Sequence, residues 1–566
     1  MSELSPFLIY FLASLLVLAS PAMIRNALLL ATPVLAALHL FFNIEPGMTA
    51  SYTVLEFEMV YLRADKLSLL FAYLFTLASF ISTVFALHVK DVRQQVAGLI
   101  YAGSALGAVF AGDFLTLFIF WELLAISSVF LIWARDTERA LNAGMRYLVF
   151  QVLSGVLLLA GALLHYQETG SLMFDHVGLN GLAGWLVFIA FGIKSAFPFL
   201  HSWLTDGYPE ATPTGTVYLS AFTTKVAVYS LARGFAGEEI LVYIGVTMAC
   251  FPIFYAVIEN DLRKVLAYSL INQVGFMVTG IGIGTALSLN GAVAHAFSDV
   301  IFKGLLFMSM GAVLFRVGHV NGSDLGGLYK TMPKTTGLCI VGAMSISAFP
   351  LFSGFVSKSM VMSAMLMENY DYLWLFMLFA SAGVFHHAGI KIPYFAFFAH
   401  DSGLRPQEAP LNMLVAMALA AFVCLFIGSQ PQYLYALLPW EVDYWPYDLT
   451  HVLTQTQLLF FSALAFVWLN KQGLYPPELH STNLDAEWVY RKFLPAGVQR
   501  GLAFAHNAKK STVAATVVHM NSIRRSLSES SIAKYNLSES WPTGSMVLWI
   551  SFTLVAYLLL DIFIYK

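Results

Sequence analysis

The chain has 566 residues, of which 58% are hydrophobic and only 11% are charged, with a formal net charge of −3. Soluble domains carry about 25% charged residues, so this composition excludes a soluble protein and indicates an integral membrane protein. The charge balance gives no reason to expect a nucleic-acid partner. The three cysteines stand singly in apolar stretches, without the spacing of a metal site or a disulfide framework.

Long continuous apolar runs predict membrane-spanning helices. A helix crosses a bilayer in about 20 residues, whereas a transmembrane strand takes about 10 residues of alternating polarity. The runs here are long and unbroken, so we expect an all-α polytopic membrane protein with about 14–16 transmembrane helices. The candidate spans lie near 5–20, 24–42, 67–88, 96–112, 114–133, 142–166, 181–203, 212–235, 240–258, 264–284, 288–315, 335–366, 372–398, 409–428, 453–470 and 545–564.

The loops suggest an orientation and a division of the chain. Basic residues gather in alternate loops, which places both ends of the chain outside the cytoplasm by the positive-inside tendency. The one long polar stretch, 471–544, is expected to be a cytoplasmic amphipathic connection before the last span, with docking of a partner protein as the alternative. The expected parts are 1–95 (N-terminal helices), 96–258 and 259–430 (two repeat regions) and 431–566 (C-terminal helices).

Five ionisable residues lie inside apolar stretches: Glu122, Lys194, Lys225, Lys303 and Lys391. A charged side chain near the bilayer centre costs roughly 2.5–3.5 kcal/mol even on insertion scales. Such residues usually mark ion or proton pathways. The sequence therefore predicts a route for protons or cations, with Lys194 as the partner of Glu122.

Prolines next to two of the lysines predict broken helices. Pro198 follows Lys194 by four residues, and Pro393 follows Lys391 by two. Proline removes a backbone donor and clashes with the preceding turn, so each helix should kink or break there. Paired discontinuous helices are typical of repeats in transporters. The other two lysines, Lys225 and Lys303, are expected on continuous helices.

His295, Asp299 and Lys303 follow one another at steps of four residues. This spacing places them on one stripe of a helix. Histidine titrates near neutrality, so three ionisable groups in register favour a proton relay over a single hydrogen-bonded core histidine.

Four further residues are weaker candidates. His387 repeats the i, i+4 spacing with Lys391, and His386 adjoins it. His201 lies just past Pro198, where it can continue the path or cap a helix. Lys358 follows an expected helix break and is interpreted as a loop charge.

Six blocks of sequence resemble a known family, the antiporter-like membrane subunits shared by Mrp-type cation/proton antiporters, respiratory complex I and membrane-bound hydrogenases. The similarity runs from about residue 60 to 430 and is greatest to the D subunit of the Mrp type. It is carried by DFLTLFIFWELLAISSVFLI (113–132), KSAFPFLHSWLTDGYPEATPTGTVYLSAFTTKVAVY (194–229), ENDLRKVLAYSLINQVGF (259–276), HAFSDVIFKGLLFM (295–308), NGSDLGGLYKTMP (321–333) and FPLFSGFVSK (349–358).

The resemblance implies two inverted five-helix repeats, each containing a broken helix. It also implies that Glu122 sets the proton affinity of Lys194, that Lys225 and Lys303 relay protons centrally, and that Lys391 passes them to the exit. The terminal position varies in the family between Lys and Glu, and the pair His386–His387 departs from the family pattern.

We therefore expect a proton-translocating subunit of a multisubunit Na⁺/H⁺ antiporter, in a bacterial cell membrane and with other membrane subunits as partners. The alternative is a proton-pumping subunit of a complex I-like NADH/quinone or hydrogenase complex. A third hypothesis is a non-transporting scaffold. It does not explain why the chain would bear the free-energy cost of placing these charges in the membrane. No nucleophile–base pair, phosphate loop or metal cluster is visible in the sequence, so neither catalytic residues nor a cofactor is expected.

Overall fold

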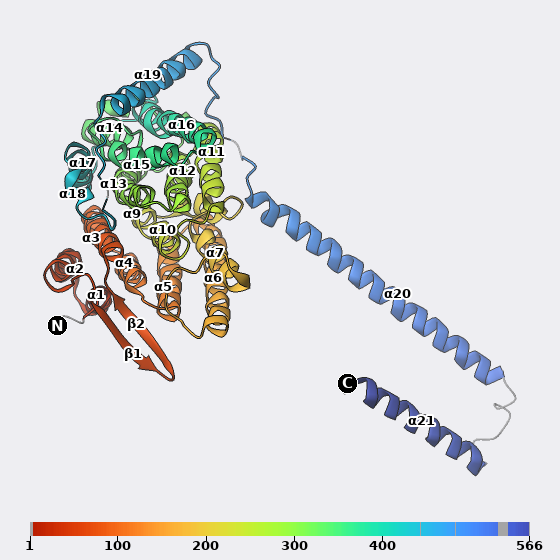
Figure 1. Cartoon of the computed structure of the whole chain (residues 1–566). Helices are drawn as coiled ribbons and strands as arrows, with labels where there is room; N and C mark the ends of the chain where they lie inside the picture. The colour runs from red at the N-terminus through yellow and green to blue at the C-terminus, as the bar shows by residue number, and fades with distance from the viewer. Residues whose placement is uncertain (1–3, 442, 481–482, 530–541, 565–566) are drawn as a thin grey trace. The chain divides into compact units, whose positions relative to one another are not determined.

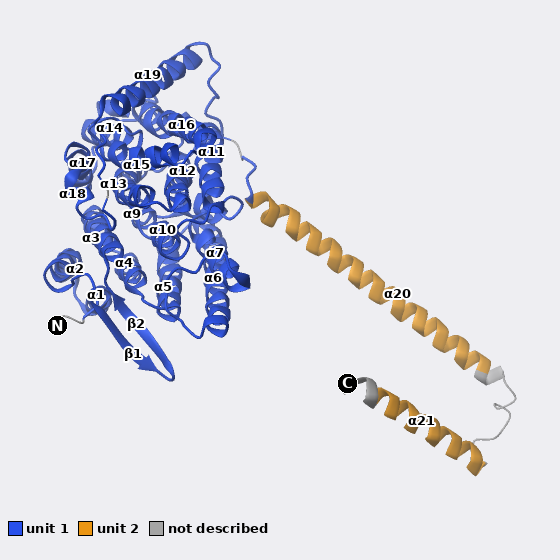
Figure 2. Cartoon of the chain, in the orientation of Figure 1, with its two compact units in different colours: residues 1–486 blue, residues 487–566 orange. Residues whose placement is uncertain are grey.

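The computed structural model describes residues 4–441, 443–480, 483–529 and 542–564. The chain divides into two compact units, residues 1–486 and residues 487–566 (Figure 2). The first unit carries the helical bundle, and the second consists of two long helices (Figure 1).

In its described residues the first unit consists of helices joined by loops, with one β-hairpin. Its α-helices are α1 (Phe7–Ala19), α2 (Ala22–Asn43), α3 (Lys66–Ala86), α4 (Val92–Phe110), α5 (Phe114–Trp133), α6 (Glu138–Thr169), α7 (Gly181–Lys194), α8 (Ser202–Gly207), α9 (Gly215–Ala221), α10 (Thr223–Gly234), α11 (Ile240–Ile258), α12 (Leu262–Ile283), α13 (Ala286–Val317), α14 (Pro333–Ile346), α15 (Ser353–Met367), α16 (Asp371–Val384), α17 (Leu411–Ser429), α18 (Gln432–Tyr435) and α19 (Leu449–Lys471).

Eleven helices in the described part of the chain are long and apolar enough to cross a membrane. This confirms the expected all-helical membrane architecture. The sequence windows gave a larger number because they also counted shorter apolar helices, such as α1 and α7, and stretches that the backbone divides.

The hairpin is an addition that hydropathy windows do not detect. Strands β1 (Thr49–Val54) and β2 (Phe57–Arg63) pair antiparallel after α2. The segment is rich in β-branched and aromatic residues, which favour strands. The hairpin meets the bundle through the Val60 amide, which donates to the Asp113 carboxylate at 2.6 Å.

Two runs of helices repeat each other in length and order. Helices α4 and α11 each have 19 residues, α6 and α13 each have 32, and α7 and α14 each have 14. Helices α5 and α12, with 20 and 22 residues, complete the series. The expected inverted orientation of the two repeats stays a prediction.

The ends of the repeated helices are fixed by the same kinds of residue. Asp113 begins α5 by accepting from the Thr116 amide at 2.8 Å, and Asp261 begins α12 by accepting from the Arg263 amide at 2.8 Å. Such caps satisfy backbone donors that have no partner inside the helix. Helices α6 and α13 both end at a glycine in the left-handed conformation, which glycine adopts without steric cost.

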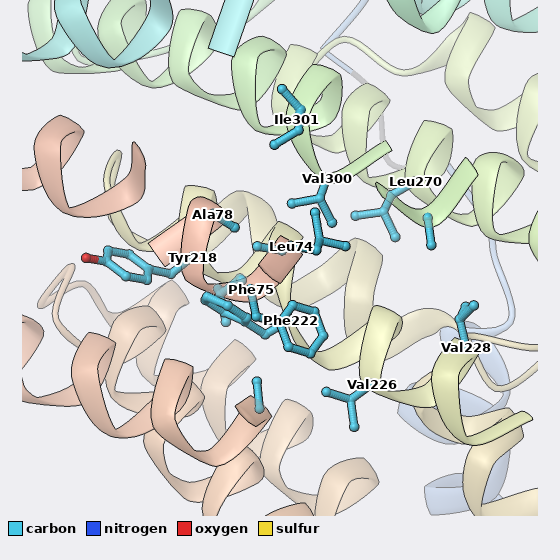
Figure 3. Close-up of a cluster of buried hydrophobic side chains, with 14 of the residues drawn as sticks. Leu74, Phe75, Ala78, Tyr218, Phe222, Val226, Val228, Leu270, Val300 and Ile301 are labelled. Carbon is cyan, nitrogen blue, oxygen red and sulfur yellow. The ribbon is translucent and has the colours of Figure 1, made fainter. Parts of the chain in front are cut away.

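The centre of the bundle is apolar. Helices α3, α9, α10, α12 and α13 meet there, and their buried side chains interlock as Figure 3 shows. This layer includes Val226 and Val300, which adjoin the charged residues Lys225 and Asp299 in the chain. The charges thus lie inside a packed apolar interior, where removing them from water is costly.

The second unit contains α20 (Leu494–Glu529) and α21 (Thr543–Ile564), preceded by a π-helical turn at Val489–Phe493. Helix α20 accounts for much of the expected polar connection at 471–544, while residues 530–541 lie outside the described part of the chain. Helix α21 is a candidate membrane span, as expected. The division into parts at 95, 258 and 430 and the cytoplasmic side of the connection stay predictions.

Candidate functional site

The first broken helix lies where the sequence predicts it. Helix α7 ends at Lys194, and α8 begins only at Ser202. Between them Ala196 and Phe199 adopt the left-handed backbone region, with φ of 62° and 67°. Residues other than glycine seldom occupy this region, and such strain is usually associated with functional sites. The helix therefore opens next to a buried lysine.

The second expected break, at Lys391 and Pro393, is wrong. Residues Asp371–Phe398 form one continuous helix. Two π-helical turns, Phe385–Lys391 and Tyr394–Phe398, flank Pro393. Their wider turns accommodate the proline, whose ring would clash with the preceding turn of an α-helix.

The second break instead separates α14 from α15. There Ala348 and Leu351 have φ of 58° and 73°, matching Ala196 and Phe199 in the first break. The same tetrapeptide, Ser-Ala-Phe-Pro, occupies 195–198 and 347–350. This internal repeat is the sequence signal that identifies the second break.

The interpretation of Lys358 as a loop charge is also wrong. Lys358 lies on α15, directly after the second break, and is 3% exposed. Its ammonium donates to the Ile346 carbonyl at 3.4 Å and lies 4.8 Å from the Phe276 ring centroid. It also interacts electrostatically with Asp299. Lys358 therefore joins the buried ionisable residues.

Lys194 and Glu122 interact electrostatically, as expected of partners. The Lys194 ammonium donates to the Trp121 carbonyl at 2.5 Å and lies 4.4 Å from the centroid of the Trp121 ring. Within the described residues no ion pair of 4 Å or less joins the two charges. The Glu122 carboxylate packs against Gly155, where any Cβ would collide with its Oε1. The two side chains are therefore close enough to interact electrostatically without forming a direct ion pair.

Lys225 forms the tightest buried ion pair. Its Nζ lies 2.6 Å from Oδ2 of Asp299, and both side chains are fully buried. The ammonium also donates to the Ser220 carbonyl at 3.2 Å. The expected continuous helix around Lys225 is wrong, because Phe222 interrupts it between α9 and α10. The interruption frees backbone groups near the lysine.

Helix α13 carries the predicted stripe without interruption, and His295, Asp299 and Lys303 are all fully buried on it. Lys303 Nζ donates to the Ser269 hydroxyl at 2.8 Å. His295 has polar partners on both ring nitrogens, Ser357 Oγ at 3.0 Å and Gln273 Oε1 at 3.1 Å. The histidine is thus fixed in orientation.

These residues form one electrostatic cluster. Lys303 interacts with Asp299, Lys225 and Lys358, and His295 interacts with all three lysines. His387, fully buried on the π-helical turn, interacts with both Lys303 and Lys391 and so connects the cluster to the next helix. The ionisable groups of four helices therefore influence one another in the interior.

Lys391 has more hydrogen-bond and ion-pair partners than the sequence predicts. Its Nζ donates to the carbonyls of Ala256, Val257 and Glu259 at 3.1, 2.7 and 2.7 Å, at the end of α11. It also forms an ion pair with Glu478 at 2.9 Å. Glu478 lies in the polar segment after α19, which sequence reasoning did not connect to the path.

His201 also meets a carboxylate from that segment. Its Nε2 lies 3.1 Å from both oxygens of Asp485, and the Tyr268 hydroxyl donates to Asp485 at 2.7 Å. The side chain makes no capping hydrogen bond to α8. His386 instead packs among rings, 5.3 Å from Phe466 and 5.4 Å from Tyr475.

The two groups of charges are not directly connected. In the described part of the chain no hydrogen bond or ion pair joins Lys194 to Lys225. Ser195 and Thr224, their neighbours in sequence, each bury a hydroxyl with no protein partner in the same described part. Buried groups of this kind are commonly satisfied by internal water, which also conducts protons between side chains.

Residues 111–385 match the family described as NADH:quinone oxidoreductase/Mrp antiporter, transmembrane. The matched segment contains Glu122, the three lysines 194, 225 and 303, and both helix breaks. This match confirms the resemblance read from the sequence blocks, and the chain is a multi-span protein of the cell membrane.

The chain is similar to two kinds of curated protein. It is 27% identical to hydrogenase-4 component B of Escherichia coli (strain K12), over 67% of this chain and 64% of that protein. It is 28% identical to the D subunit of the Na(+)/H(+) antiporter of Alkalihalophilus pseudofirmus, over 58% of this chain and 72% of that protein. The chain thus spans somewhat under two thirds of the hydrogenase component and nearly three quarters of the antiporter protein.

Solved structures share the fold of this chain. A chain of the Mrp complex from Dietzia sp. DQ12-45-1b aligns with a TM-score of 0.75 and 23% identity, covering 88% of this chain and 59% of that one. A chain of an archaeal membrane-bound sulfane sulfur reductase aligns with a TM-score of 0.72 and 23% identity, covering 98% and 99%. At such identities the likeness establishes the fold alone.

Proposed function

We propose that this chain is a proton-translocating subunit of a multisubunit antiporter that exchanges protons for a monovalent cation, with Na⁺ as the first candidate. The observation that carries the proposal is the cluster of fully buried ionisable side chains, centred on the Lys225–Asp299 pair at 2.6 Å. Charges in the membrane interior are costly and are characteristic of proton relays.

The proposed path begins at Glu122 and Lys194. While the Glu122 carboxylate is near, it favours the protonated ammonium of Lys194. Movement of the broken helix separates the two groups and releases a proton toward Lys225. The Lys225–Asp299 pair passes it to Lys303.

From Lys303 the path continues to the second half of the bundle. His387 interacts with both Lys303 and Lys391, which supports a step between the two lysines. Lys358 and His295 lie in the same electrostatic cluster and tune the charge on Lys303. The path thus contains every residue proposed from the sequence except His201 and His386, with Lys358 added.

The partners of the chain are proposed to be other membrane subunits, since its relatives are named as subunits or components. The test is transport by the purified complex in proteoliposomes. We expect an imposed Na⁺ gradient to drive proton movement in the opposite direction, monitored with a pH-sensitive dye. A complex that moves no protons under a Na⁺ or K⁺ gradient would contradict the antiporter proposal.

A second candidate is a proton-pumping subunit of a redox-driven complex. It is supported by the 27% identity to hydrogenase-4 component B of Escherichia coli (strain K12). Here proton movement would require an electron donor and acceptor, processed by other subunits, and not a cation gradient. Identification of the co-purifying subunits by mass spectrometry, followed by proton flux with each driving force, separates the two candidates.

A further inference from the structure

The segment after α19 supplies acidic side chains to two buried bases. We call its described residues, 473–480 and 483–486, the strap. The strap belongs to the first unit, and Figure 1 shows the chain after α19 passing beside α11. Its Glu478 pairs with Lys391, and its Asp485 pairs with His201.

The strap is anchored to the bundle by contacts independent of these pairs. Tyr475 is 7% exposed, and its ring lies 5.1 Å from the Phe466 ring and 6.0 Å from the Phe395 ring. The Asn483 side chain donates to the Glu259 carboxylate at 3.2 Å. The position of Glu478 therefore does not depend on its own ion pair alone.

Glu478 lies between a buried partner and exposed neighbours in the chain. The side chain of its partner Lys391 is fully buried, and that of Glu478 itself is 4% exposed. The next two residues, Leu479 and His480, are well exposed. A proton that leaves Lys391 through Glu478 thus has a short route to water.

We propose that Glu478 is a proton-transfer residue at the surface end of the buried path, exchanging a proton directly with Lys391. This inference rests on the proposed proton translocation and extends it to a carboxylate outside the transmembrane helices. Their 2.9 Å separation is within hydrogen-bond reach, as a direct proton transfer requires.

The proton exchange between Lys391 and Glu478 requires no other reactant. An N–H bond of the Lys391 ammonium breaks, and an O–H bond forms on the Glu478 carboxylate. The carboxylic acid then loses its proton to water at the surface and becomes a carboxylate again. The neutral Lys391 amine accepts the next proton from the interior, from the side of His387 and Lys303. The reverse sequence brings protons in.

The charged and polar groups around Glu478 favour a carboxyl that can gain and lose a proton. Burial raises the pKa of Glu478, and the negative charge of Glu259 adds to this, while Lys391 opposes it. The pKa remains above its ordinary range. Other ionisable groups nearby are Tyr475, which interacts with Glu478, His386, which interacts with Lys391, and Lys264, which pairs with Glu259 at 2.9 Å.

The experiment compares proton flux in the reconstituted complex carrying Glu478→Gln, Glu478→Asp or Asn483→Ala. Glutamine keeps the shape of the side chain but cannot take up a proton, so flux should fall about tenfold or more. Aspartate keeps the titratable group, so flux should recover in part, with a shifted pH profile. Asn483→Ala removes an anchoring hydrogen bond to Glu259 but leaves Glu478 able to titrate, so flux should stay well above that of Glu478→Gln.

Two results would overturn the inference. One is wild-type flux with Glu478→Gln. The other is an equal loss in Asn483→Ala and Glu478→Gln, which would show that Glu478 only anchors the strap.

A second readout separates this inference from the proposed function. Infrared difference spectra between acidic and alkaline pH should contain a protonated-carboxyl band that Glu478→Gln removes. If the wild-type complex transports no protons, the proposed function fails, and this band still decides whether Glu478 titrates. Spectra that are identical in the variant and the wild type would show that it does not.

Discussion

At the scale of single residues, Gly155 makes room for the acid of the first pair. Since a Cβ at this position would collide with Oε1 of Glu122, Gly155→Ala should displace the carboxylate and change its influence on Lys194. We expect proton flux to fall by about tenfold, equivalent to ~1.4 kcal/mol in the transport barrier, while the folded complex still assembles.

The control for this prediction is the Glu122→Gln background. If Gly155→Ala acts through the carboxylate, the double variant should transport no more slowly than Glu122→Gln alone, because the two changes remove the same interaction. Additive losses would show that the glycine matters for helix packing instead.

The Lys225–Asp299 pair leads to a prediction about stability. Breaking a buried ion pair by removing one partner strands the other charge and costs about 3–5 kcal/mol. We expect Asp299→Asn or Lys225→Met to lower the thermal unfolding midpoint of the detergent-solubilised complex clearly. The double variant Lys225→Met/Asp299→Leu should lose less than either single variant. A double variant that loses the sum of both would contradict a direct pair.

The sequence allowed the burial of the lysines to be predicted, because their apolar surroundings extend far beyond the reach of a snorkelling side chain. It did not reveal their partners. Asp299 reaches Lys225 from another helix, and Glu478 reaches Lys391 from a polar loop. Such contacts depend on tertiary packing, which local spacing does not encode.

At the scale of elements, the breaks are the features with the clearest local cause. Gly354, the second residue of α15, lies so close to the Ser345 carbonyl that a Cβ would collide with that oxygen. The obstacle is backbone and cannot rotate away. We expect Gly354→Ala to destabilise the protein by about 1–3 kcal/mol, measured as a lower thermal unfolding midpoint.

Gly337 is the matched control on the preceding helix. Nothing lies within 4 Å of a Cβ at this exposed position, and alanine favours a helix over glycine by ~1 kcal/mol. Gly337→Ala should therefore be neutral or stabilising. If both substitutions had the same effect, the close approach at the second break would have no energetic importance.

The strap should respond to pH through Asp485. Burial alone would raise the pKa of this carboxyl, but the hydrogen bonds and charge of His201, with the Tyr268 hydroxyl, outweigh it and hold the pKa below its ordinary range. A carboxyl whose pKa is lower in the folded state than in the unfolded state stabilises the folded state above its ordinary pKa of about 3.9. This stabilisation is lost as the pH falls through the lower pKa of the folded state.

We therefore expect amide hydrogen exchange of residues 483–486, corrected for the intrinsic pH dependence, to stay protected from neutral pH down to about pH 4. Protection should fall only below that value. In Asp485→Asn the acid-dependent loss should be absent. An acid-dependent loss of protection that persists in Asp485→Asn would contradict control by this carboxyl.

Helix breaks were only partly predictable at this scale. Pro198 identified the first one, because proline disrupts the turn before it. The same rule failed at Pro393, since a π-helical turn accommodates the ring without a break. A local residue rule cannot distinguish these outcomes, whereas the repeated Ser-Ala-Phe-Pro identifies both true breaks.

At the scale of the whole molecule, the chain combines a packed first unit with a second unit whose two long helices, in their described residues, bury little surface against each other. The apolar side chains of these two helices are therefore expected to contact lipid or other subunits. A chain ending at Ala486 should keep the unfolding midpoint of the first unit, while fewer partner subunits should co-purify with it. A large drop in the midpoint would show that the second unit stabilises the first.

The near-equal lengths of the two helical repeats allow equivalent positions to be compared. Counted from the start of each 32-residue helix, Gly155 on α6 occupies the same place as Lys303 on α13. One repeat uses this place to admit an acid from a neighbouring helix, and the other fills it with a base. The two repeats therefore place opposite chemistry at one equivalent position, and a side chain suited to one is unsuited to the other.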